Sequence, residues 1–386
     1  MDISRVLKRR GLCAADISVV QRYIDFRFSV AGPALTTIGK DASYLAMFRQ
    51  RLPDGVRLEN MNTDDILAAI SDMRSRYTEN TFNSMWKTVR PFLRWFANQK
   101  PGQIDLQTVS AVRLTRPGPV ITSADILTQD QIRILRDQCC INSRERAALM
   151  LLYDSGGRAS ETLCDTKWGD FVFDSRGVKF NLAGKTKKQR HVRLLLCQQY
   201  LSAWRADYPG EPRGDAPVFV RRRYAGKDPQ PYQYSTVQMW MRRLEEQYEK
   251  YTGEPIHLHA HIFRHTRITH MIQEGYPLAY VSMQMWGVPS SPQILYYVHL
   301  CGEDMDKMLF AHLGMEDPGE AGRQQPLTPA QCPYCRTVIS PGYTYCPECG
   351  RMLKADADTG DDTPTIEQMI ADPELMARFL LQLARK

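Results

Sequence analysis

Histidine and arginine side chains are concentrated in one short stretch, HAHIFRHTRITHM, residues 259–271. It holds four of the chain's eight histidines and two arginines. In a helix that begins near His261, the i, i+3, i+4 rule places His261, Arg264 and His265 on one face. This face continues into two isoleucines and is therefore expected to point inward. A partly buried imidazole and guanidinium are costly unless an anion lies between them, so the stretch predicts an anion site.

Two other interpretations of this stretch remain open. Each histidine on its own is compatible with a satisfied position inside a core. Alternatively, His257, His259 and His261 alternate along the chain, as the ligands of a metal ion can. Arg264 lies in their midst and favours an anion, because its charge would oppose a bound cation.

A second guanidinium stands where one predicted helix has ended and the next begins, in YDSGGRASETL. After the glycine pair, Arg158 can chelate two non-bridging oxygens of a phosphate, which a lysine cannot do bidentately. Glu161, three residues later, is placed to hold this arginine or to cap the following helix. The alternative is a solvated surface arginine.

Two C-x-x-C pairs, CPYC and CPEC, predict a metal site near the C-terminus. Thiolates at such spacing form two knuckles around a tetrahedral ion, and four cysteine ligands leave no open coordination position. We therefore expect a structural zinc in a ribbon over residues 328–354, which either presents a basic and aromatic surface to DNA or protein or has no partner. The remaining six cysteines are scattered and are expected to be reduced thiols. The predicted ligands are Cys332, Cys335, Cys346 and Cys349.

Length and composition limit the number of domains, the kind of partner and the location of the protein. A chain of 386 residues with 43% hydrophobic and 24% charged residues suits two or three folded domains. The net charge of +7 permits a polyanionic partner without proving one. The first residues lack the apolar region of a signal peptide, and no run approaches the roughly 18 apolar residues of a membrane span. These features predict a cytoplasmic protein with no membrane contact.

Apolar periodicity predicts the elements that position these side chains. Residues 81–98 form an amphipathic helix whose aromatic stripe is more suited to a core than to base stacking, and another helix begins at Thr63. Prolines and the loss of periodicity predict a linker at 101–122. Residues 177–196 alternate on either side of GKTKKQ and predict a β-hairpin with a basic tip. A short amphipathic helix is expected at 364–386, for packing or self-association.

Taken in order, these motifs resemble the tyrosine recombinase or phage-type integrase family. The resemblance runs through most of residues 30–300 and rests on RASE, on GKTKKQR in the hairpin, on H-x-x-R-H, and on a tyrosine shortly before H-L in ILYYVHL. It implies that the catalytic residues are Arg158, Lys185, His261, Arg264 and Tyr297, with Glu161, His265 and His299 in supporting positions. Tyr296 competes with Tyr297 for the role of nucleophile, and the Y-x-H spacing favours Tyr297.

The resemblance also implies a fold that is mainly α with a small β-sheet. Residues 1–105 would form a helical, SAM-like core-binding domain that closes a clamp around DNA. Residues 123–314 would form the α+β catalytic domain, followed by the small four-cysteine zinc ribbon at 328–354 and the helix at 364–386. Double-stranded DNA is the implied partner, and a tetramer of identical chains is the implied assembly. Candidate contacts to the DNA backbone are Lys187, Lys188, Arg190, Arg221, Arg222 and Arg223.

The chemistry of such a site suits these residue types. A tyrosine can attack a DNA phosphodiester and hold the phosphate covalently, and an imidazole such as His261 can accept its proton. Arg158 and Arg264 would neutralise the phosphoryl oxygens, while Lys185 would protonate the departing 5′ oxygen. No catalytic metal or nucleotide is expected, since the sequence has no Walker loop and no aspartate cluster.

One position departs from the family pattern. The family has histidine, or sometimes tryptophan, nine residues before the nucleophile, whereas this chain has Val288 in WGVPS. Valine cannot hydrogen-bond a phosphoryl oxygen, so reduced activity is expected. The main prediction is a site-specific recombinase or integrase of a mobile element. The alternatives are a catalytically degenerate DNA-binding protein of the same fold and a type IB topoisomerase.

Overall fold

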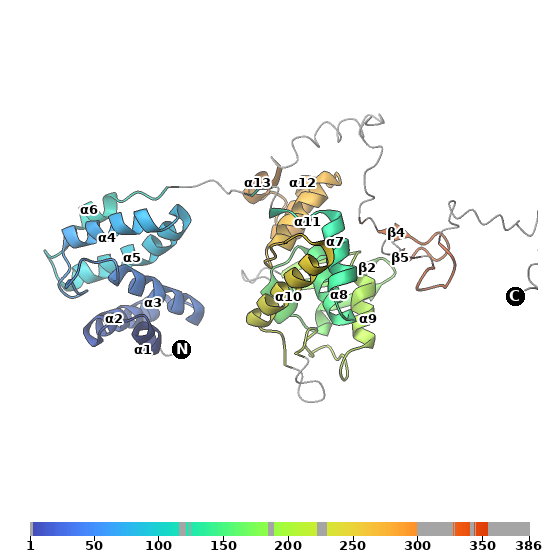
Figure 1. Cartoon of the computed structure of the whole chain (residues 1–386), viewed down its shortest axis with the longest axis horizontal. Helices are drawn as coiled ribbons and strands as arrows, with labels where there is room; N and C mark the ends of the chain where they lie inside the picture. Colours follow the sequence, from blue (N-terminus) through green and yellow to red (C-terminus); the bar gives the residue numbers. More distant parts are fainter. Residues whose placement is uncertain are drawn as a thin grey trace, which may run out of the picture. The chain divides into compact units, whose positions relative to one another are not determined.

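The structure is a computed structural model of the chain, which divides into two compact units, residues 1–119 and 120–386 (Figure 1). In agreement with the predicted fold class, the described part is mainly helical and has two small antiparallel sheets. In the part of the chain that the structure describes, no helix is both long and apolar enough to cross a membrane. The helix predicted at 364–386 lies outside the described residues. The structure describes residues 3–115, 121–122, 125–183, 189–221, 230–298, 327, 329–339, 343 and 345–353.

The described part of the first unit is built from helices around a single core. In α5, the predicted stripe is buried, with Phe82 and Trp86 stacked at 6.3 Å between ring centroids, so these aromatic side chains serve packing. At the start of α4, Asn62 and Asp65 form a reciprocal capping box that satisfies two backbone N–H groups. The helices are α1 (Ile3–Arg9), α2 (Ala14–Ala31), α3 (Leu35–Arg49), α4 (Thr63–Arg76), α5 (Glu79–Gln99) and α6 (Leu106–Ala111).

The linker predicted at 101–122 is partly wrong, because α6 lies within it. Asp105 caps this helix by accepting hydrogen bonds from the backbone N–H groups of Gln107 at 2.8 Å and Thr108 at 3.3 Å. Val109 is fully buried in the core of the first unit. A helix of six residues is too short to produce a detectable apolar period, so only its cap marked it in the sequence.

The described part of the second unit combines helices with a three-stranded sheet. The α-helices are α7 (Gln129–Ile134), α8 (Ser143–Ser155), α9 (Gln198–Ala206), α10 (Tyr234–Thr252), α11 (Ile262–Gln273), α12 (Leu278–Trp286) and α13 (Leu295–Val298). Shorter turns are the π-helices η2 (Leu135–Cys139) and η3 (Ser160–Cys164) and the 3₁₀-helices η4 (Trp168–Asp170) and η6 (Pro292–Ile294). The strands are β1 (Phe171–Asp174), β2 (Gly177–Ala183) and β3 (Gln189–Leu194).

The three strands pair antiparallel in the order β1-β2-β3. The register pairs Phe180 with Phe171 on one side and with Val192 on the other, which places apolar side chains of all three strands on the same face. The predicted hairpin is confirmed in its two strands, β2 and β3, whereas its basic tip at 184–188 lies outside the described residues.

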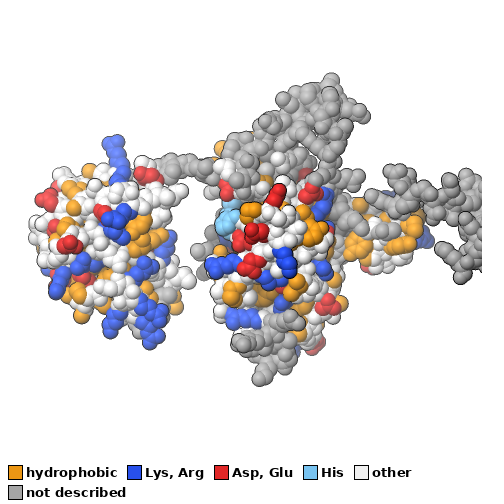
Figure 2. Space-filling model, in the orientation of Figure 1, with side chains coloured by type: hydrophobic (Ala, Val, Ile, Leu, Met, Phe, Trp, Pro, Cys, Tyr) orange, Lys and Arg blue, Asp and Glu red, His pale blue; other side chains and the backbone are white. Residues whose placement is uncertain are grey.

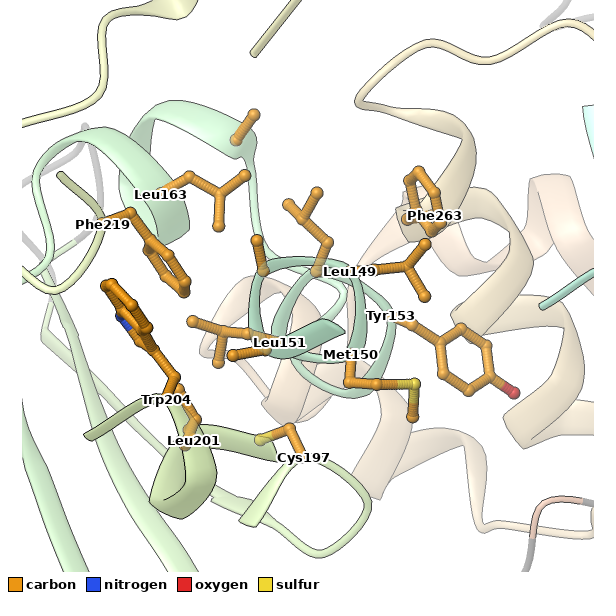
Figure 3. Close-up of a cluster of buried hydrophobic side chains, with 14 of the residues drawn as sticks. Leu149, Met150, Leu151, Tyr153, Leu163, Cys197, Leu201, Trp204, Phe219 and Phe263 are labelled. Atoms are coloured by element: carbon orange, nitrogen blue, oxygen red, sulfur yellow. The ribbon is translucent and has the colours of Figure 1, made fainter. Parts of the chain in front are cut away.

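Helix α8 occupies the centre of the second unit (Figure 3). Its residues 147–155 are buried on all sides, and side chains from neighbouring elements, such as Trp204 of α9 and Phe263 of α11, surround it. A helix that is apolar all round belongs in a core. It ends at Gly156, whose φ of 54° is readily adopted by glycine, and a Cβ there would lie 2.7 Å from the Met285 side chain.

The end of α8 is also fixed by a buried carboxylate. Asp154 accepts hydrogen bonds from the backbone N–H groups of Leu196 at 2.7 Å and Cys197 at 3.1 Å, where α9 begins. The guanidinium of Arg267 lies 3.9 Å from the same carboxylate, and both side chains are buried. Because α8 leads directly into the Gly156–Arg158 segment, these contacts set the position of that segment.

We predict that Asp154→Ala destabilises the protein by about 3–5 kcal/mol, because it leaves two buried N–H groups without their acceptor and removes one of the two carboxylates that face the buried Arg267. The measurement is urea unfolding of the full chain. Asp207→Ala, at the exposed end of α9, is the matched control and should cost no more than about 0.5 kcal/mol. Equal losses for the two variants would show that the Asp154 carboxylate does not anchor α8.

Candidate functional site

Arg158 is held by a carboxylate at the start of η3. Its Nη1 donates a hydrogen bond to Oε1 of Glu161 at 2.7 Å. The Arg158 side chain is 47% exposed, whereas that of Glu161 is 5% exposed. A buried carboxylate thus orients this arginine, which confirms the predicted pairing of the two residues, while the binding of a phosphate by Arg158 stays a prediction.

Arg190 does not lie where the sequence prediction put it. It was expected to contact the DNA backbone, but its side chain is 7% exposed and donates from Nη2 to Oε2 of Glu161 at 3.1 Å. Its Nη1 donates to the backbone carbonyl oxygens of Met285 and Gln284. The alternation of β3 explains the error, because Arg190 shares the inward face with Val192 and Leu194. Burial lowers the pKa of Arg190, although Glu161 opposes this effect.

Arg264 is buried between the ends of two helices. Its Nη1 donates to the carbonyl oxygen of Gly156 at 2.7 Å, and its Nη2 donates to that of Met285 at 2.8 Å. Its guanidinium also lies over the Trp286 ring, 5.2 Å from the centroid. Burial, and then the charges of Arg190 and Arg158, lower the pKa of Arg264 to about 10, so it stays protonated at neutral pH.

The predicted histidine face is present at the start of α11. His261 and His265 lie one turn apart, with their rings perpendicular and 4.7 Å between centroids. His261 keeps an exposed surface at the helix start, and the partial loss of its hydration lowers its pKa to about 4, with contributions from the charges of His265, Arg264 and Arg158. Burial also lowers the pKa of His265. Both imidazoles are therefore neutral at pH 7.

Tyr297 points toward these histidines and Tyr296 is on the surface. Nδ1 of His265 lies 2.8 Å from the Tyr297 hydroxyl. In the tautomer of the neutral imidazole that carries its hydrogen on Nε2, Nδ1 accepts the hydrogen bond that the hydroxyl donates. Tyr297 is 4% exposed and Tyr296 is 40% exposed. Burial raises the pKa of Tyr297, which the charge of Arg264 partly offsets. This arrangement supports Tyr297 as the nucleophile.

Histidine side chains also gather on the surface of the second unit (Figure 2). His257 and His259 are exposed, with 6.2 Å between their ring centroids. Among the described residues, however, the nitrogens of these histidines do not converge on a common point as metal ligands would. The metal interpretation of this stretch is therefore wrong for the described residues, and the anion interpretation remains.

Helix α12 ends at the site and brings Trp286 into it. The centroids of the Trp286 and Tyr297 rings lie 6.3 Å apart, a contact that no pattern in the sequence predicted. Gly287, with φ of 73°, follows, and a Cβ there would lie 3.1 Å from Cγ of Arg190. Val288 is half-buried in the next position. The departure from the family pattern thus lies beside the arginine cluster.

Other predicted residues are not brought into the site by the described structure. Arg221 is half-buried, and its backbone N–H donates to the carbonyl oxygen of Gln230 at 3.1 Å. The remaining predicted residues lie outside the described ranges: Lys185, Lys187, Lys188, Arg222, Arg223 and His299.

The four predicted cysteine ligands converge on one point. Their sulfur atoms all lie within 4.8 Å of one another. A tetrahedral zinc with Zn–S bonds of about 2.3 Å requires sulfurs about 3.8 Å apart. The Sγ atoms of Cys332 and Cys349 are 3.8 Å apart, and those of Cys335 and Cys346 are 3.6 Å apart, so the residues fit this ion.

The two knuckles of this cluster have the same backbone geometry. The N–H of Arg336 donates to the carbonyl oxygen of Cys332 at 3.0 Å, and Gly350 donates to Cys346 at 2.8 Å. Both donors have positive φ, 62° and 71°. Strands β4 (Ala330–Gln331) and β5 (Val338–Ile339) pair beside the first knuckle.

Comparison with known proteins identifies relatives of the chain. Residues 125–301 match the phage integrase family. The chain is 23% identical over 269 residues to tyrosine recombinase XerC of Rickettsia bellii. This alignment covers 66% of this chain and 82% of that protein. It is 31% identical over 193 residues to transposase A from transposon Tn554 of Staphylococcus aureus, which covers 45% of this chain and 51% of that protein.

Solved structures share the fold. Lambda integrase (residues 75–356) bound to DNA matches with a TM-score of 0.55 and 17% identity, over 74% of this chain and 96% of that one. The Tn1549 transposon integrase in complex with a circular intermediate DNA matches with a TM-score of 0.56 and 16% identity. This match covers 76% of this chain and 99% of that one. The family match assigns residues 125–301 of the chain to the phage integrase family, and the two solved structures show that the fold is shared.

Proposed function

We propose that the chain is a site-specific DNA recombinase that cuts and rejoins DNA through a 3′-phosphotyrosyl intermediate, for the integration or excision of a mobile element. The observation that carries this proposal is the placement of the Tyr297 hydroxyl against a neutral imidazole, beside Arg264. The relatives named as a recombinase and as transposon proteins support the same activity.

Arg158 and Arg264 bind the scissile phosphate in this mechanism. Each guanidinium nitrogen of Arg264 that donates to a carbonyl oxygen keeps a second hydrogen for a phosphoryl oxygen. Donors that are fixed before the reaction stabilise the charge that develops in the transition state, which is usually the largest catalytic contribution. Glu161 holds Arg158 in place without contacting the phosphate.

Tyr297 then attacks the phosphorus atom. A bond forms between its Oη and phosphorus as the phenolic proton passes to the neighbouring imidazole. The bond from phosphorus to the 5′ oxygen breaks, and the 5′ oxygen takes a proton, which we assign to Lys185. The phosphotyrosyl bond conserves the energy of the broken phosphodiester, so a 5′ hydroxyl can reverse the step and rejoin the strand.

Double-stranded DNA and further copies of the same chain are the proposed partners. Solved relatives include a lambda integrase dimer bound to a core site and a lambda integrase tetramer bound to a Holliday junction. By analogy, we assign a tetrameric synapse to this chain. Its proposed place of action is the cytoplasm.

The cysteine cluster is proposed to hold one structural zinc. Cys332, Cys335, Cys346 and Cys349 would supply four thiolates, and a bound zinc would stabilise the fold of the ribbon. The cluster has no place in the phosphoryl transfer, since the arginines and tyrosine that carry it lie on α11, α13 and the turn after α8.

Covalent trapping on DNA tests the assignment of Tyr297 as the nucleophile. On a nicked suicide substrate that spans the attachment region of its own element, the protein should form a covalent adduct that survives a denaturing gel. Tyr297→Phe should abolish this adduct, and Tyr296→Phe, which removes an exposed hydroxyl, should retain it. Retarded DNA that never becomes covalently linked would favour the degenerate DNA-binding protein, and cleavage without a specific footprint would favour a type IB topoisomerase.

Arg264→Lys should slow adduct formation on the order of 10²-fold, because one ammonium cannot replace two fixed guanidinium donors. Gel-shift affinity for the same DNA should change far less. Arg176→Lys, the same change on an exposed turn, is the control and should react at the normal rate. A normal rate for Arg264→Lys would remove Arg264 from the mechanism.

Native mass spectrometry should find one zinc ion for each chain. Cys346→Ser should lose this ion, whereas Cys13→Ser, at an exposed cysteine outside the cluster, should retain it. Adduct formation at short times after the addition of a chelator should be unchanged, because the metal is structural. A chelator that stops cleavage at once, while the ribbon stays folded, would assign the ion a catalytic role.

A further inference from the structure

We propose that His265 is the catalytic base that takes the proton from Tyr297 and returns it when the strand is rejoined. This inference rests on the proposed function and deepens it, because the sequence pattern pointed to His261 for this role and placed His265 only in support. The observation that carries it is the 2.8 Å contact between Nδ1 of His265 and Oη of Tyr297.

The geometry places His265 in direct contact with the reacting atom. A general base must lie within about 2.6–3.2 Å of the oxygen whose proton it accepts. The two rings are tilted by 34°, with 5.7 Å between their centroids, so that a ring nitrogen meets the hydroxyl at the edge. His265 is half-buried on α11, and Tyr297 is buried on α13. The hydrogen bond therefore joins two elements that already pack together in one core.

The charged groups around His265 keep it neutral before the reaction. Burial and the neighbouring His259 lower the pKa of His265, and Arg264 on the same helix lowers it too, whereas Asp125 raises it. His261 packs against its ring from the start of α11. A neutral imidazole is the form that accepts a proton. Once His265 is protonated, Asp125 is the anionic group that stabilises the imidazolium.

The step balances in atoms and charge. The O–H bond of Tyr297 breaks as Nδ1–H forms on His265, while the bond from phosphorus to Oη forms and the bond from phosphorus to the 5′ oxygen breaks. The departing 5′ oxygen takes its proton from a different group, Lys185 in the mechanism above. In the reverse step, His265 returns the proton to Oη as the tyrosine leaves. His261 is then available for a phosphoryl oxygen beside Arg264.

The test compares His265→Gln with the unsubstituted protein in single-turnover adduct formation between about pH 6 and 9. Glutamine can still accept a hydrogen bond from Tyr297 but cannot take its proton. We expect the rate at pH 7 to fall on the order of 10²-fold. The unsubstituted rate should be nearly flat above about pH 6.5, the ordinary pKa of histidine, since His265 is already neutral there. It should fall only at a pH lower than this, because burial lowers the pKa of His265. The rate of the variant should instead keep rising with pH, as hydroxide removes the proton.

A modified substrate separates the base from the acid. When sulfur replaces the bridging 5′ oxygen, the leaving thiolate needs no proton. This substrate should restore the rate of Lys185→Ala but not that of His265→Gln. Restoration of His265→Gln by the sulfur substrate would assign His265 to the leaving group and overturn the proposal.

His257→Gln provides the matched control, because it makes the same change at a histidine whose side chain is 90% exposed. It should react at the normal rate. Thermal unfolding and gel shifts establish that His265→Gln folds and binds DNA. As a second measurement, His265→Gly should be rescued by added imidazole. A folded His265→Gln that keeps the normal rate and pH profile, or a folded His265→Gly that imidazole does not rescue, would overturn the inference. Failure of the proposed function is distinct, since the unsubstituted protein would then form no adduct.

Discussion

The site depends on how three neighbouring guanidinium groups are accommodated in and beside a protein interior. Arg190 and Arg264 are buried, and Arg158 lies next to them. Neighbouring positive charges repel one another, and each buried guanidinium group also loses its hydration. Two kinds of acceptor offset these costs. The carboxylate of Glu161 binds two of the arginines, and backbone carbonyl oxygens at helix ends bind the buried pair.

The use of helix ends as acceptors explains several otherwise unrelated features. The last carbonyl groups of a helix have no partner within it and carry the negative end of the helix dipole, so a buried arginine is well matched to them. Gly156 terminates α8 and Gly287 terminates α12, both with positive φ. Each glycine lets the chain turn away immediately, which leaves the carbonyl groups of residues 156 and 285 open to Arg264.

The sequence predicted those parts of the site that depend on local spacing. The face formed by His261, Arg264 and His265 follows from helical geometry, and the pairing of Arg158 with Glu161 follows from their separation of three residues. The choice of Tyr297 over Tyr296 rested on family spacing and agrees with which ring is buried. Contacts between positions that are far apart in the chain could not be predicted from the sequence. The bond between His265 and Tyr297 joins positions 32 residues apart, and no pattern encodes that distance.

The error at Arg190 has a different origin. A cluster of basic residues at a hairpin is typical of an exposed, DNA-facing strand, whereas successive residues of a strand point to opposite faces. The alternation of β3 already placed Arg190 on the same face as two apolar residues, but only the structure supplies the carboxylate that makes such burial tolerable. Similarly, the six residues of α6 were too few to show a period, although Asp105 marked its start.

The carbonyl oxygen of Met285 accepts from both Arg190 of β3 and Arg264 of α11. One atom at the end of α12 therefore connects the strand that bears the hairpin to the helix that bears the histidines. Assembly of the site is consequently cooperative, because a shift of α12 would loosen both arginines together. The free energy with which β3 packs against the end of α12 is therefore coupled to the free energy with which α11 packs there. A small displacement of this helix end would therefore weaken the contacts of both arginines at the same time.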